Sequence, residues 1–158
     1  MSSEINHDDV VKSQQKAFSH NEENLPSQIN DTPWVYAINK TIDYPSTTNN
    51  AGGKWMVMVY REQVDSFWLK IKESLLAGQL GREAKSSTKM PNPNSPDPRL
   101  GVIIVYTNDA QNEPDVMRVR EVLRNLGVTW KIGYKTDNAT LRGQYNVRGK
   151  KRVSLYYC

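Results

Sequence analysis

The sequence is poor in the residues that build disulfides, metal sites and acid–base pairs. Its single cysteine, Cys158, is the last residue, which excludes an internal disulfide framework and fits a reducing compartment. Its two histidines, His7 and His20, both lie at the N-terminal end. No group of residues has metal-ligand spacing, and neither a P-loop nor a Gly-x-Gly-x-x-Gly motif occurs. We therefore predict no metal, no cofactor and no catalytic residue.

Long hydrophobic runs are also missing. No stretch is long enough for a transmembrane helix, and the first residues lack the basic-then-apolar order of a signal peptide. The sequence thus predicts a protein of the cytoplasm or nucleus that has no membrane partner.

Positive charge is concentrated toward the C-terminal end. Residues 1–30 hold two lysines and five acids, whereas residues 31–158 hold nineteen Lys/Arg and twelve acids. From residue 131 onward, seven basic residues accompany one acid, Asp137. This asymmetry predicts an anionic partner, either RNA or a nucleotide-type phosphate ligand, or an acidic protein.

The first thirty residues differ from the rest in apolar content as well. They are rich in Ser, Asn, Gln, Asp and Glu, and their few apolar residues follow no sustained period. Burial cannot offset the entropy lost on ordering such a segment. We predict a disordered acidic tail over residues 1–30 and a single folded domain over residues 31–158.

The folded part carries alternating strand and helix signals. Apolar residues at helical spacing predict helices over about 62–77 and 113–125, with Asn112 as the N-cap of the second. Apolar runs or alternation predict extended segments at 32–38, 54–60, 83–89, 101–106, 131–136 and 152–157. Long proline-rich and basic loops favour an antiparallel β-sheet with two helices packed on one face, which is an α+β fold. The other face is then left for a ligand.

Two groups of polar residues are candidates for phosphate binding. Lys85, Ser87 and Lys89 alternate along a predicted strand, so they share one face, although a solvated edge has the same pattern. The second group lies in the C-terminal loop, where Asp137 either orients an arginine or caps the turn; its members are Lys135, Thr136, Asp137, Arg142 and Tyr145. Trp34 is a candidate for base stacking, with a core position as the alternative.

Several short motifs resemble those of a known family. They are Asp31-Thr-Pro-Trp34, Gly52-Gly-Lys-Trp55, Phe67-Trp68, Gly78-Gln-Leu-Gly81 and Tyr134-Lys-Thr-Asp137. Together they resemble a cytosolic family typified by the basophilic-leukaemia-expressed protein, over roughly residues 31–157. That family shares the fold of translation initiation factor 4E, the messenger-RNA cap-binding protein, so the resemblance implies a 4E-like domain.

The more distant likeness to the 4E factor implies roles for particular residues. Trp34 is similar to a cap-stacking tryptophan, and Lys85, Lys89 and Arg99 lie in the region that supplies phosphate-binding bases. Val35 stands where the factor has a glutamate that reads the edge of guanine. The resemblance therefore implies non-catalytic binding of RNA or a nucleotide-type phosphate ligand, with looser specificity than cap recognition.

Two alternatives remain open. Some members of the family are described as having a phosphothreonine lyase domain, which implies elimination of phosphate by a lysine base and a histidine acid, with arginines holding the phosphate. The other alternative is a protein-interaction module that docks an acidic partner, whose sign is an exposed apolar patch on the helices.

Overall fold

The computed structural model describes residues 24–42, 51–91, 97–137, 146–147, 150–151 and 154–158. Six strands form one sheet in the order β1-β3-β4-β2-β5-β8, and every pair is antiparallel. In that order the strands are β1 (Trp34–Ile38), β3 (Glu83–Ser87), β4 (Leu100–Thr107), β2 (Gly53–Tyr60), β5 (Gly133–Thr136) and β8 (Tyr156–Tyr157). A separate two-stranded ladder pairs β6 (Asn146–Val147) with β7 (Lys150–Lys151).

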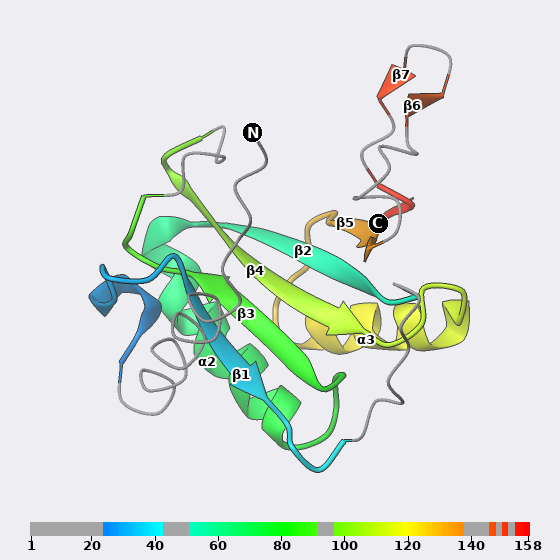
Figure 1. The fold of residues 1–158 in the computed structure, drawn as a ribbon, viewed down its shortest axis with the longest axis horizontal. Helices are drawn as coiled ribbons and strands as arrows, with labels where there is room; N and C mark the ends of the chain where they lie inside the picture. The colour runs from blue at the N-terminus through cyan, green and yellow to red at the C-terminus, as the bar shows by residue number, and fades with distance from the viewer. Residues whose placement is uncertain (1–23, 43–50, 92–96, 138–145, 148–149, 152–153) are drawn as a thin grey trace, which may run out of the picture.

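Both helices, α2 (Arg61–Leu76) and α3 (Glu113–Asn125), lie on the same side of the sheet (Figure 1). The predicted α+β architecture, with two helices on one face of an antiparallel sheet, is confirmed. Within the described ranges, no helix is long and apolar enough to cross a membrane.

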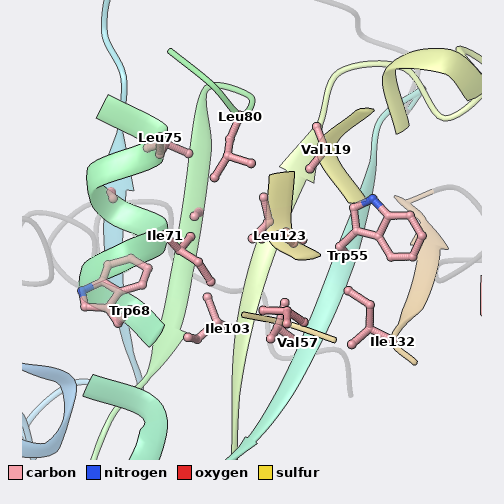
Figure 2. Close-up of a cluster of buried hydrophobic side chains, with 14 of the residues drawn as sticks. Trp55, Val57, Trp68, Ile71, Leu75, Leu80, Ile103, Val119, Leu123 and Ile132 are labelled. Atoms are coloured by element: carbon pink, nitrogen blue, oxygen red, sulfur yellow. The ribbon is translucent and has the colours of Figure 1, made fainter. Parts of the chain in front are cut away.

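The core lies between this face of the sheet and the helices. Side chains alternate across a strand, and β2 accordingly buries Trp55, Val57 and Val59 while Lys54, Met56 and Met58 lie on the other face. From α2, Trp68 and Ile71 pack toward the same layer, as Figure 2 shows. Each such side chain contributes roughly 1.5–3 kcal/mol when fully buried, so this layer is the main source of the stability of the fold.

Local signals in the sequence set the bounds of α3. Asn112 caps its N-terminus by accepting a hydrogen bond from the Asp115 backbone N–H, and Pro114 lies in its first turn. Gly127 follows the helix with a φ of 105°, a conformation that glycine adopts without strain. The predicted bounds of 113–125 therefore match the structure.

The ordered domain begins before residue 31, and that predicted boundary is too late. A short 3-10 helix, η1 (Pro26–Gln28), packs against α2, and Ile29 is only 2% exposed within the core. The Ser27 backbone N–H and hydroxyl both donate to the Asp65 carboxylate on α2. The burial of Ile29 and the hydrogen bonds of Ser27 therefore anchor this segment, although most of its residues are polar. Residues 1–23 lie outside the described part of the chain.

Candidate functional site

The face of the sheet opposite the helices is the candidate site. No described helix covers it, and we call it the open face. Its side chains come from alternate positions of β1, β3, β4, β2 and β5, and they are mostly half-buried. They include Trp34, Tyr36, Lys54, Met56, Met58, Glu83, Lys85, Val102, Tyr106 and Lys135.

Lys85 lies among three aromatic rings of this face. Its Nζ is 4.2 Å from the centroid of the Trp34 ring, 6.0 Å from that of Tyr36 and 5.9 Å from that of Tyr106. Strand register explains the arrangement, since Lys85 pairs with Tyr36 on β1 and with Ile104 on β4. A lysine ammonium at such distances from ring faces makes cation–π contacts.

The ionisable groups around Lys85 are perturbed. Burial lowers the pKa of the Lys85 ammonium, and the charge of Lys54 lowers it further against the opposing attraction of Glu83. Burial likewise raises the pKa of the Glu83 carboxyl. Burial and the Glu83 charge together raise the pKa values of the Tyr36 and Tyr106 phenols. Both phenols therefore stay neutral near pH 7 and can donate hydrogen bonds to a ligand.

Two further lysines lie opposite each other at the β2–β5 side of the open face. Lys54 and Lys135 are register partners, so their Cβ atoms are neighbours across the strands. The Asp137 carboxylate lies 3.9 Å from the Lys54 ammonium, which offsets part of this repulsion. Like charges placed directly opposite destabilise a sheet, and a bound anion would relieve that cost.

The structure brings only some of the predicted site residues together. Lys85, Lys135 and Trp34 share the open face, and Asp137 lies at its edge beside Lys54. Thr136 follows Lys135 on β5 and is half-buried. Ser87 lies beside Trp34 in register, but its hydroxyl accepts the Val102 backbone N–H. Arg142 and Tyr145 lie outside the described residues.

Lys89 lies apart from Lys85, contrary to the predicted row. The strand ends at Ser87, because the Lys89 backbone N–H donates hydrogen bonds to the carbonyls of Pro26 and Ile29. The Lys89 side chain is exposed and lines a cavity of about 330 Å³ together with Arg61. The predicted strand over 83–89 is therefore two residues too long. Lys89 does not share a strand face with Lys85, so it drops out of the predicted group of phosphate-binding residues.

Sequence reasoning missed four residues of this face, namely Tyr36, Lys54, Glu83 and Tyr106. Their signal was alternation within short apolar segments, since Lys54, Met56 and Met58 repeat every second residue of β2. The near-continuous apolar run from Trp55 to Tyr60 hid that period. Only strand pairing shows that the four residues meet.

The described residues offer no group of three or more His, Cys, Asp or Glu side chains that could hold a metal ion. Both histidines precede residue 24, so the described part of the chain supplies no histidine acid for a lyase reaction. Among the described residues of the open face, Lys85, Glu83 and the two phenols have perturbed pKa values and could move a proton.

Comparison with known proteins identifies the family. The profile of the family described as basophilic leukemia-expressed protein Bles03 matches residues 4–141. The chain belongs to the Bles03 family. The match includes β1 to β5 and therefore every described residue of the open face. A search of curated proteins finds no similar sequence.

Solved structures share the fold of this Bles03-family chain. A schistosome eIF4E complexed with m7GpppG and 4E-BP superposes with a TM-score of 0.62 at 16% identity, over 96% of this chain and 81% of that one. The complex of the same factor with m7GpppA and 4E-BP gives the same TM-score and coverage at 15% identity. C. elegans eIF4E-3, in complex with the 4E-binding protein Mextli and a cap analog, gives a TM-score of 0.53 at 17% identity, over 76% and 67% of the two chains. The fold is therefore 4E-like.

Proposed function

We propose that this domain binds a nucleotide-type phosphate ligand, free or within RNA, on its open face and without catalysis. One observation carries the proposal: an aromatic ring, Trp34, shares the open face, which no described helix covers, with three lysines, Lys54, Lys85 and Lys135. A flat ring takes up a base by stacking, while ammonium groups take up phosphate oxygens. The eIF4E structures of the same fold, which hold cap nucleotides, support the choice of ligand class.

The local geometry argues for a ligand that carries both parts. The Lys85 ammonium already lies over the Trp34 ring, so a base that stacks on this side of the ring has to displace it. A phosphate on the same ligand compensates for that displacement by giving the ammonium a new partner. Val35, the residue after Trp34, is fully buried on the helical side and cannot read the edge of a base. We therefore propose recognition of ring and phosphate rather than of guanine in particular.

Replacing Trp34 with alanine should weaken nucleotide binding by about 1–3 kcal/mol, the usual contribution of one stacked base. This corresponds to roughly a 5- to 150-fold increase in Kd. Isothermal titration with GTP, ATP, m7GpppG and a short RNA at two salt concentrations measures this change in Kd.

Neutralising Lys54 and Lys135 with glutamine should weaken nucleotide binding as well and reduce its dependence on salt, because fewer charges remain to be screened.

Lys70→Gln supplies a matched control, because Lys70 is an exposed lysine of α2 on the opposite side of the sheet. Its variant should bind like the wild type. The proposal fails if no phosphate ligand binds, or if the Lys54 and Lys135 variants bind every ligand as the wild type does.

A second candidate function rests on the outer surface of α2. Leu69 and Leu76 are 52% and 53% exposed and lie two helical turns apart on one side of the helix. Exposed leucines at this spacing form a contact surface for an apolar partner segment. The eIF4E complexes contain 4E-binding proteins, which supports a protein partner for this domain too.

Replacing Leu69 and Leu76 together with glutamate should abolish binding of a 4E-binding-protein peptide, measured by titration calorimetry. Tyr60→Ser is the matched control, since Tyr60 is equally exposed, at 54%, but lies at the end of β2. Equal binding by both variants, or no binding by the wild type, would remove this candidate.

A further inference from the structure

Lys85 combines the features that turn a lysine into a nucleophile. Its amine is half-buried on the open face, over an indole ring and between two phenols. Its register partner on β4, Ile104, is only 6% exposed and places an apolar side chain beside Lys85. Removal from water favours the neutral amine, and a second cation close by favours it further.

The charges that act on Lys85 come from β2, from β3 and from the residue after β5. Lys54 on β2 lowers the pKa of the Lys85 ammonium, whereas Glu83 on β3 and Asp137 after β5 raise it. Contact with the Trp34 ring also favours the charged form. Burial and Lys54 outweigh Glu83 and Asp137, so these effects together place the pKa of Lys85 below that of an ordinary lysine.

We propose that Lys85 forms a reversible imine with an aldehyde or ketone that carries a phosphate group. The lone pair of the neutral Nζ attacks the carbonyl carbon, the C=O π bond breaks, and one proton passes from nitrogen to oxygen to give a carbinolamine. The nitrogen lone pair then forms the C=N bond as the hydroxyl leaves with a proton as water, and the nitrogen gives up its second proton, so one amine and one carbonyl give one imine and one water. No electrons are exchanged and no further reactant is needed.

The surroundings suit both ends of such a ligand. The Tyr36 and Tyr106 phenols remain neutral at physiological pH and can donate a proton or a hydrogen bond to the carbonyl oxygen. Lys54 and Lys135 lie on the same face and can hold the phosphate. The inference does not require that a nucleotide binds, and it adds covalent chemistry to a face so far described only as a binding surface.

Reductive trapping tests the proposal on the full chain. The protein is incubated with pyridoxal 5′-phosphate, or with propionaldehyde as a carbonyl without phosphate, in the presence of cyanoborohydride, and the adducts are mapped by peptide mass spectrometry. We expect Lys85 to carry most of the adduct with both carbonyls, and to react more completely with the phosphorylated one at low salt. Lys85→Arg should lose that adduct while keeping the melting temperature of the wild type.

Lys70 provides the matched comparison, since its Nζ lies 5.4 Å from the Phe67 ring but the side chain is exposed. Lys70→Arg should leave the adduct yield unchanged. Lys54→Gln should move the pH dependence of Lys85 labelling to higher pH, a shift that a merely structural lysine would not show. An adduct spread over the exposed lysines, or retained in full by Lys85→Arg, would overturn the inference. Neither result depends on nucleotide titration, so the two proposals fail separately.

Discussion

Replacing Arg120 with methionine should lower the free energy of unfolding by at least about 4 kcal/mol, because a hydrogen bond from a charged group contributes roughly 1.5–3 kcal/mol and three are lost. The Arg120 side chain is only 1% exposed. Its guanidinium donates to the backbone oxygens of Val128 at 2.9 Å, Trp130 at 2.8 Å and Cys158 at 2.9 Å. Methionine fills the space but offers no donor to the buried Val128 acceptor or the half-buried Trp130 acceptor, whereas the Cys158 oxygen still accepts the Ile132 backbone N–H.

The consequence should be large because Arg120 connects three separate segments. It joins α3 to the chain that leads into β5 and to the residue after β8. For a domain of this size, a loss of about 4 kcal/mol corresponds to a fall in Tm of roughly 8–16 °C, measurable by calorimetry.

Arg124→Met is the control for this substitution, since Arg124 occupies the next turn of α3. It pairs with Glu121 on the surface, and both side chains are largely exposed. Surface pairs contribute about 0–1 kcal/mol, so Tm should change little. Equal losses of unfolding free energy for the two variants would show that the hydrogen bonds of Arg120 do not stabilise the contacts of α3 with these segments.

Replacing Gly53 with alanine should destabilise the domain by about 3 kcal/mol, as overpacking of a rigid core does. A Cβ at Gly53 would lie 2.1 Å from the Tyr134 hydroxyl oxygen and 2.4 Å from the adjacent ring carbon. Tyr134 cannot withdraw, because it is fully buried and its hydroxyl shares a 2.6 Å hydrogen bond with Thr107. Its ring also packs edge-on against Trp55, with centroids 5.1 Å apart.

A double-mutant cycle with Tyr134→Phe checks the cause. That substitution removes the hydroxyl nearest to the new methyl group and, by itself, loses the hydrogen bond to Thr107, which contributes about 1 kcal/mol. Urea denaturation should show the double variant to be more stable than the sum of the two losses predicts. Strict additivity would indicate that Gly53 is required for a reason other than contact with Tyr134.

Local signals were sufficient wherever one element determines its own bounds. The helix predicted over 113–125 matches α3, because Asn112, Pro114 and Gly127 act within a turn of it. The helix predicted over 62–77 differs from α2 by one residue at each end. Local sequence signals failed where contacts with distant segments decide where a strand ends or whether a residue is buried. β3 ends early because η1 captures the Lys89 backbone, and Ile29 joins the core although its neighbours in sequence are polar.

The sequence by itself determined the class of the fold, the place of its helices and the basic character of its C-terminal half, because side-chain period, capping residues and composition act locally. It also placed Trp34, Lys85 and Lys135 among the candidates. Only the tertiary structure decided that these residues share one face with Tyr36, Tyr106, Lys54 and Glu83. Strand register determines which side chains meet, and the burial created by that meeting lowers the pKa of Lys85. Neither register nor burial exists before the strands pair.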